Sequence, residues 1–335
     1  MKLADKTKEI LKANNLDFTI VKRPMRVYIG GELVETDTHA LINNKIGKVI
    51  GTCKKGYVIS QTKDVVHKVV KGMQGFRNLS TVYGGAIHDG KKIYLQLAIE
   101  GDALIGNDTI KRYVTVLDSN DGSSSLSIGI GNLTMSCANQ FFKFYKASDA
   151  RFRHSASITE KLDTIPNLIE FALLEDMRMT EIYKAFQKTP ITKKLVDGLL
   201  KNLIGVETLE EEMSKVASNK LLELRGAISL EMKGSVATPS VEAIRGNKKL
   251  GIEGVKAIDA INDYEGKGEN LWGLFSGVTR WTTHTKSAPK RENGRIESMV
   301  LGSNYTTNQS ALDYCLEALN VTLKEQGVEE MSMAN

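Results

Sequence analysis

Apolar and polar residues alternate through much of the first half of the chain. An apolar residue stands at every second position in residues 16–20, 93–99 and 126–130, a period typical of strands with one buried face. The dipeptides Gly30-Gly31 and Asp89-Gly90 lie between such runs, and both are typical of tight hairpin turns. The first half is therefore predicted to be a mostly antiparallel sheet with covering helices.

The spacing changes near residue 150. Between Ile158 and Leu173 apolar residues recur at steps of three and four, which is typical of a helix that buries one stripe. Further helices are predicted over residues 2–14, 64–76, 191–203, 209–232, 270–284 and 310–324. The prediction is an α+β fold, with a β-rich domain over 1–150 and a helical region over 151–335 packed on it, as two domains or as one continuous domain.

The late predicted helix carries two glycines on one stripe. Gly273, Gly277, Arg280 and His284 follow one another at steps of four, three and four. Glycine costs a helix interior about 1 kcal/mol relative to alanine. Two glycines on one face therefore indicate that another backbone or a ligand comes close to that face.

Charge and cysteine content narrow the classes of function. The net charge is 45 − 40 = +5 with a pI near 8.8, which permits phosphate contacts without the charge density of a dedicated basic protein. Cys53, Cys137 and Cys315 are far apart and have no C-x-x-C spacing, so neither a disulfide framework nor a zinc knuckle is predicted. Residues 1–15 carry charges throughout and lack a long apolar run. A cytoplasmic protein without a membrane partner is expected.

Two segments combine cations with aromatic rings, the composition of a groove for single-stranded nucleic acid. The first spans residues 141–154 and the second residues 280–295. Aromatic rings at such mixed spacing are also typical of a hydrophobic core, and this alternative stays open. Phe152 and Trp281 are the predicted base-stacking rings. The predicted nucleic-acid-binding residues are Lys143, Lys146, Arg151, Phe152, Arg153, His154, Arg280, Trp281, His284, Lys286, Lys290 and Arg291.

The turn over residues 118–125 (DSNDGSSS) is the densest group of short polar side chains. Such residues are typical of a hairpin loop that closes on its own amides. Asp118 and Asp121 could bind a divalent cation, but the calcium-loop pattern lacks its final glutamate, because Gly129 stands there. No phosphate-binding loop, nucleophile elbow or zinc-protease motif is present, so no catalytic residue, metal ligand or cofactor is predicted.

Four short motifs in this order resemble a phage/plasmid-like protein family of unknown function found in bacteriophages, prophages and conjugative elements. Residues 118–123 (DSNDGS) are similar to the family's SNSHDGS turn, with Asn120 in place of histidine. Cys137-Ala138-Asn139 is similar to its Cys-x-Asn element, and residues 151–155 (RFRHS) to its R-x-R-H-T/S element. Residues 272–284 resemble its W-G-x-x-N-A-V-T-x-Y-x-x-H helix, with Ser276 for asparagine and Trp281 for tyrosine. The resemblance implies a mobile-element origin and no settled activity.

These observations favour an accessory protein of a mobile element that binds nucleic acid, single-stranded DNA above all, in recombination or replication. The rival hypothesis is an inhibitor that binds a host defence or regulatory protein, which needs an exposed apolar patch. A metal-dependent nuclease built from Asp118, Asp121, His154 and His284 ranks last, because these residues share no ligand spacing. The oligomeric state is left open, a homo-oligomer included.

Overall fold

Two antiparallel sheets form the N-terminal half of the protein, for which a computed structural model describes residues 3–74, 81–135, 138–144, 151–152, 160, 162–207, 215–232, 267–291 and 294–332. The first sheet has three strands in the order β1-β2-β3. It follows helix α1 and precedes helix α2. The bounds are α1 Leu3–Ala13, β1 Ile20–Ile29, β2 Glu32–Asn43, β3 Lys48–Lys54 and α2 Thr62–Gly72.

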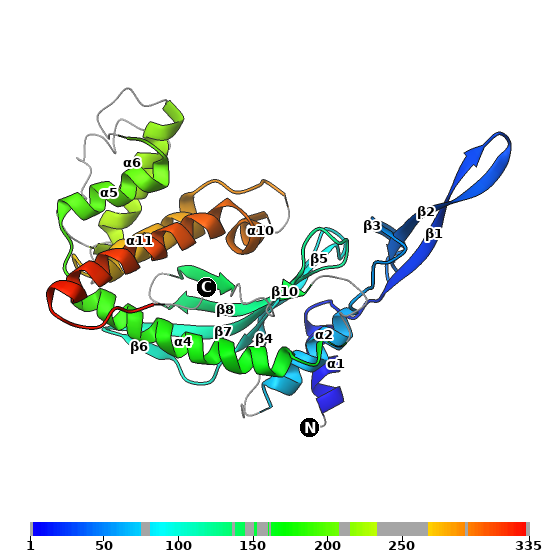
Figure 1. Ribbon diagram of the computed structural model, residues 1–335, viewed down its shortest axis with the longest axis horizontal. Coiled ribbons are helices and arrows are strands. Elements are labelled where there is room, and N and C mark those ends of the chain that lie inside the picture. The colour runs from blue at the N-terminus through cyan, green and yellow to red at the C-terminus, as the bar shows by residue number, and fades with distance from the viewer. Residues whose placement is uncertain are drawn as a thin grey trace.

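Strands β1 and β2 form a long hairpin that projects from the body of the molecule (Figure 1). Its turn is Gly30-Gly31, with φ angles of 60° and 94°. Glycine reaches these positive angles without a steric penalty. We call residues 20–43 the arm, and the predicted Gly-Gly hairpin is confirmed.

The second sheet has strand order β10-β8-β7-β5-β4, with β6 added beside β7 and β9 beside β8. All of its pairings are antiparallel. The predicted turn at Asp89-Gly90 joins β4 to β5, and both residues have positive φ. The bounds are β4 Thr81–Ile87, β5 Lys92–Ala98, β6 Ala103–Ile105, β7 Asp108–Ser119, β8 Leu126–Thr134, β9 Gln140–Phe144 and β10 Arg151–Phe152.

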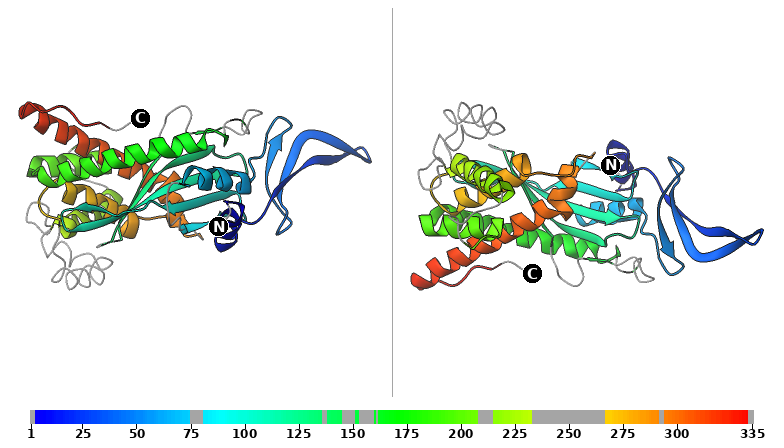
Figure 2. Two further views of the ribbon diagram at one scale, coloured as in Figure 1. Left: turned by 90° about the horizontal axis from the view of Figure 1, so that it is seen from below. Right: turned by 90° about the horizontal axis from the view of Figure 1, so that it is seen from above.

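Helices cover both faces of the second sheet (Figure 2). The face with Ile93, Leu95 and Val116 packs on α1, α2 and the start of α4. The opposite face, with Leu117 and Phe142, packs on α10. The helical bounds are α4 Ile165–Lys188, α5 Lys193–Ile204, α6 Lys215–Met232, α9 Leu271–Arg280, the π-helix η2 Trp281–Thr285, α10 Gly294–Leu301 and α11 Ser303–Glu325.

The largest hydrophobic cluster joins the end of this sheet to the helices. Ile110, Ile130 and Phe141 share it with residues of α4, α5, α6, α9 and α11. The β-rich and helical halves therefore contribute to a common core. The domain boundary near residue 150 stays a prediction.

The glycine stripe of α9 lies against other backbone. A Cβ atom on Gly277 would lie 2.4 Å from Ile228 Cα of α6, and one on Gly273 would lie 2.3 Å from the Gly268 carbonyl oxygen. Real Cβ atoms do not approach other atoms this closely. The sequence prediction of a close approach is confirmed, and the approaching group is backbone.

The predicted α+β class is confirmed. The sequence patterns placed most elements but gave α11 a start at residue 310 instead of Ser303, and they did not predict α10. The start of the helix expected over 209–232 lies outside the described residues, which resume at Lys215. None of the helices within the described ranges is long and apolar enough to cross a membrane.

Candidate functional site

The first predicted nucleic-acid-binding segment is described only in part. Lys143 lies on β9 and is half-buried. Arg151 and Phe152 form β10, whose backbone pairs with β8. Lys146, Arg153 and His154, and the side chains of Arg151 and Phe152, lie outside the described residues.

The second predicted segment begins with residues that face the interior. Arg280 Nη1 lies 3.0 Å from Glu231 Oε1, an ion pair with a carboxylate that is fully buried. Trp281 is 1% exposed and donates its indole N–H to Glu223 over 3.2 Å. A buried ring cannot stack on a base, so the prediction of Trp281 as a stacking ring is wrong for this fold.

The remaining cations of that segment differ in their burial and in their polar partners. Lys286 donates to the Ser303 carbonyl oxygen and lies 5.3 Å from the centre of the Trp281 ring. Burial lowers the pKa of Lys286 to about 8. Arg291 is exposed but pairs with Glu297, whereas Lys290 is exposed without a polar partner among the described residues. Most of this predicted cluster therefore stabilises the fold.

Hydrogen bonds join strand β9, which holds the start of the first predicted segment, to η2 and α11. The backbone N–H of Gln140 in β9 donates to Thr283 Oγ1 of η2 over 3.1 Å. The side-chain amide of Gln309 in α11 donates to the backbone carbonyl of Phe142 over 2.8 Å. Strand residues alternate between faces, so Lys143 extends from the face opposite to Phe142, which faces α10. The described cations of the two segments do not form a single row.

Two of the resemblance motifs meet at a buried polar network. Asn139 is 3% exposed and donates to Glu231 Oε1 over 3.2 Å and to the Ser276 carbonyl over 3.1 Å. Both amide hydrogens are thus engaged, and Asn139 Oδ1 accepts from His284 Nε2 at 3.2 Å. His284 is exposed. Its ring orientation is fixed by this contact.

The network continues through a buried lysine. Lys267 Nζ lies 3.0 Å from Glu231 and 3.1 Å from Asp108, with 2% of its side chain exposed. Asp108 also accepts from the Trp272 indole over 2.8 Å. Buried charges need such partners, because desolvation is costly. The network joins β7, α6 and α9.

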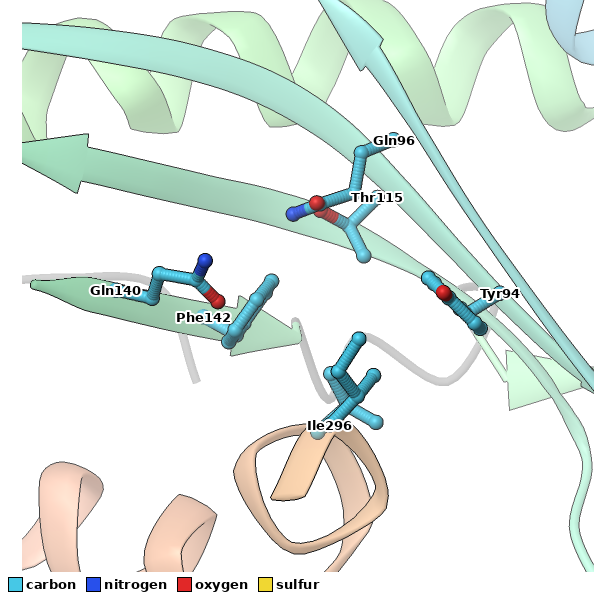
Figure 3. Close-up of a pocket in the computed structure, with 7 residues that line it drawn as sticks. Tyr94, Gln96, Thr115, Gln140, Phe142 and Ile296 are labelled. Atoms are coloured by element: carbon cyan, nitrogen blue, oxygen red, sulfur yellow. The ribbon is translucent and has the colours of Figure 1, made fainter. Parts of the chain in front are cut away.

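A cavity of about 40 Å³ lies between the second sheet and α10 (Figure 3). Two aromatic rings, Tyr94 and Phe142, stand on either side of Ile296, which points toward the sheet from α10. Thr115 Oγ1 is buried and has no hydrogen-bond partner among the described residues. The lining residues are Tyr94, Gln96, Thr115, Gln140, Phe142, Ile296 and Val300.

The polar groups of this cavity come from the sheet. Gln96 and Thr115 are paired neighbours on β5 and β7, and a Cβ on Gly131 of β8 would lie 2.8 Å from Thr115 Oγ1 and 3.1 Å from Gln96 Nε2. Gly131 therefore leaves space beside both polar groups. Amides and a free hydroxyl can donate to and accept from the edge of a planar heterocycle.

Helix α10 is held over the cavity by a carboxylate with three basic neighbours. Glu297 lies 2.6 Å from Arg291, 3.2 Å from Lys92 and 3.3 Å from His88. Burial alone would raise the pKa of Glu297, but hydrogen bonds from Arg291, Lys92 and His88 outweigh it and lower the pKa to about 2. Lys92 stands two residues before Tyr94 on the same face of β5, so the cations lie at one end of the cavity.

The 118–125 turn closes on itself, as the structural interpretation predicts. Asp118 accepts from the Ser60 hydroxyl over 2.9 Å and from the Ser119 amide over 2.8 Å. Asp121 accepts from the Ser119 hydroxyl and the Ser123 amide. Within the described ranges, no group of three or more His, Cys, Asp or Glu residues is arranged to hold a metal ion.

Comparison with known protein families assigns the chain to one of them. The sequence profile of the family described as Domain of unknown function (DUF932) matches residues 49–309. The chain belongs to this family. No curated protein and no solved structure matches it. The matched residues include the second sheet, the cavity and the buried network, and begin after β2.

The sequence patterns missed the cavity for a physical reason. Tyr94, Gln96 and Thr115 lie between the apolar positions of their strands, where solvent-facing residues are expected. Helix α10, which the sequence patterns did not predict, covers this face together with Tyr305 of α11 and makes it an interior. One sequence signal could have indicated the cavity: Tyr94 and Gln96 both stand on the face of their strand that lies opposite its apolar residues.

Proposed function

We propose that this protein binds nucleic acid, with single-stranded DNA favoured, as an accessory protein of a mobile element acting in recombination or replication. The cavity under α10 carries the proposal. It combines the Tyr94 and Phe142 rings, the Gln96 and Gln140 amides and the unpartnered Thr115 hydroxyl. Rings and amides are the groups with which proteins stack and read an unpaired base.

A single strand suits this cavity better than a duplex. A base must leave the stack to reach polar groups on a sheet face that a helix covers, and an unpaired base is already free. The present 40 Å³ has room for only a few water molecules. Entry of a base therefore requires α10 to move outward.

Cations near the cavity supply phosphate contacts in this proposal. Lys92 and Arg291 pair with the carboxylate of Glu297, and Lys290 is exposed in the segment before α10. A phosphate that takes over Lys92 and Arg291 would weaken their hold on Glu297. Strand binding and the outward movement of α10 would then favour each other.

The test is binding of a fluorescent single-stranded oligonucleotide by the full chain at increasing salt. Wild-type protein is expected to bind near 50 mM and to weaken steeply toward 200 mM, since phosphate contacts release counterions. Tyr94→Ala is expected to weaken binding about 5- to 150-fold, because base stacking contributes about 1–3 kcal/mol. Tyr94→Phe keeps the ring and should bind like wild type. Salt-insensitive binding, or equal binding by both variants, would refute the proposal.

Charge needs its own control. Lys290→Ala should lower affinity and reduce the salt dependence, whereas Lys324→Ala, which removes an exposed lysine at the end of α11, should do neither. Thr115→Val separates binding from stability. It removes a buried hydroxyl that has no partner in the part of the chain that the structure describes, so the variant should be at least as stable as wild type and yet bind the oligonucleotide less tightly.

One observation favours a second candidate function, the binding of another protein. The tip of the arm exposes apolar side chains, which is the patch that the rival hypothesis requires. An inhibitor of a host factor would use this patch and would remain bound to its partner after nuclease treatment. A partner lost on nuclease treatment would favour the nucleic-acid function instead.

A further inference from the structure

A second cavity lies beside α2, on the face of the second sheet opposite to α10. It has a volume of about 250 Å³ where α2 packs on the start of α4 (Figure 1). A water molecule takes up about 30 Å³ in the liquid, so the cavity has room for a molecule of about eight non-hydrogen atoms. Two of its lining residues, Asp64 and Asp163, are exposed, so a ligand can enter without the movement that the cavity under α10 requires. We call it the α2 cavity.

A histidine of α2 offers this cavity a hydrogen-bond acceptor. His67 Nδ1 lies 3.3 Å from Thr7 Oγ1, and the Thr7 hydroxyl donates its hydrogen to the Leu3 carbonyl oxygen over 3.0 Å. Thr7 can therefore only accept from His67, so Nδ1 carries the hydrogen of the neutral ring and Nε2 carries the lone pair. Thr7 does not line the cavity, which leaves the Nε2 side of the ring to face it. Nε2 has no polar partner within the described ranges.

The charges of the α2 cavity do not cancel. Asp64 stands in the first turn of α2, and Lys68, one turn later, pairs with Asp163, which precedes α4. The hydrogen bond from Lys68 lowers the pKa of Asp163, so this carboxylate is charged at neutral pH. One ammonium group and two carboxylates give +1 − 2 = −1 around the cavity. A cation therefore suits the cavity, and a phosphate does not.

A divalent metal ion is a poor match for this site. Calcium takes about six to eight oxygen ligands and magnesium keeps a near-ideal octahedron. Over the part of the chain that the structure describes, no three or more His, Cys, Asp or Glu residues are placed to hold a metal ion. An organic cation needs fewer ligands, because its N–H groups donate to separate acceptors.

The number of acceptors favours a guanidinium group over an ammonium group. The two oxygens of Asp64, Oδ2 of Asp163 and Nε2 of His67 have no hydrogen-bond partner among the residues described. An ammonium group has three N–H donors, whereas a guanidinium group has five in a planar fork that fits a carboxylate. Only the guanidinium group has donors for all of these acceptors.

Apolar side chains complete the lining. Ile59 and Leu162 line the α2 cavity and belong to the hydrophobic cluster beneath α2. A bare guanidinium ion would leave their surface in water, whereas a short aliphatic chain would cover it. A guanidinium group on an n-butyl chain also matches the volume of the cavity.

We propose that the α2 cavity binds an alkyl guanidinium. The cationic group contacts Asp64, Asp163 and His67 Nε2, and the aliphatic chain lies on Ile59 and Leu162. All of these residues are within the segment matched by the family profile. The site is separate from the proposed nucleic-acid function, because the sheet lies between the two cavities.

Titration of the full chain with n-butylguanidine, followed by nuclear magnetic resonance of the imidazole groups, tests this site. The His67 signals, identified by their absence in His67→Gln, should shift and saturate in the millimolar range or below. The neutral isostere n-butylurea should not shift them.

Two variants test the charge. Asp64→Asn should weaken binding of n-butylguanidine about 10- to 150-fold, because it replaces a charged hydrogen-bond acceptor with a neutral one. Asp64 is exposed, so this variant should keep the wild-type circular dichroism spectrum and melting temperature. Asp313→Asn removes an exposed carboxylate of α11 and should bind like wild type.

The guanidinium group could belong to a free small molecule or to an arginine side chain of a peptide. N-acetyl-arginine amide separates these sources: tighter binding than n-butylguanidine supports the site with a peptide ligand, and weaker binding supports it with a small molecule. Absence of saturable His67 shifts with n-butylguanidine, equal shifts with n-butylurea, or unchanged binding by Asp64→Asn would overturn the proposal.

Discussion

The packing of α9 on α6 allows one substitution to be predicted with its sign. Gly277→Ala adds a Cβ that would lie 2.4 Å from Ile228 Cα. Alanine favours a helix by about 1 kcal/mol over glycine, but backbone cannot move aside as a side chain can. Overpacking of a core costs about 1–3 kcal/mol, and a backbone clash belongs at the upper end. We expect a net loss of about 1–2 kcal/mol in the free energy of unfolding.

The same helix pair offers a matched control. A Cβ added to Gly226 of α6 would meet no described atom outside its own helix backbone within 4 Å, so Gly226→Ala should gain nearly the whole helix preference of about 1 kcal/mol. Thermal unfolding followed by circular dichroism should rank the midpoints as Gly226→Ala, then wild type, then Gly277→Ala. If Gly277→Ala unfolds at or above the wild-type midpoint, the close contact of α9 with α6 is wrong.

Three further predictions concern buried charge. Lys267→Met leaves Glu231 and Asp108 without their shared cation, and denaturant titration should show a loss of about 3 kcal/mol. The pKa of Glu297 is lowered from 4.5 to about 2. Its contacts therefore stabilise the fold fully above pH 4.5 and lose this effect as the pH falls toward 2. The difference in unfolding free energy between wild type and Glu297→Gln should shrink over that range. The pKa of Lys286 is lowered by burial from 10.5 to about 8, so the unfolded chain binds more protons between these values and stability should rise with pH there, a rise that Lys286→Gln should lack.

The sequence predicted the fold because local patterns and tertiary burial agree over most of it. Alternating runs became β5 and β8, and the Gly-Gly and Asp-Gly turns became hairpins with positive φ. Helix α10 was missed because residues 294–301 (GRIESMVL) are too few for a repeating stripe. Its stability comes from contacts with the sheet and from Glu297, and neither is visible in a short window of sequence.

The candidate site was harder to predict, because composition does not show whether a side chain points into the core or toward solvent. Arg280 and Trp281 stand in a cationic and aromatic segment, yet one pairs with a buried carboxylate and the other is 1% exposed. The arm shows the reverse error. Val27 and Ile29 alternate with polar or aromatic residues as in a strand with one buried face, but both extend beyond the body of the protein and are exposed.

Two of the four motifs quoted from the sequence, residues 137–139 and 272–284, account for packing more directly than for chemistry. Asn139 ties β9 to α6 and α9, Trp272 binds Asp108 of β7, and Gly277 admits the backbone of α6. His284 completes the set by donating to Asn139. Each of these residues fixes how the helices sit on the sheet, so each would be required whatever the protein binds. The features that can select a ligand are therefore the cavity under α10, the α2 cavity and the tip of the arm, and substitutions there should change binding while leaving the fold intact.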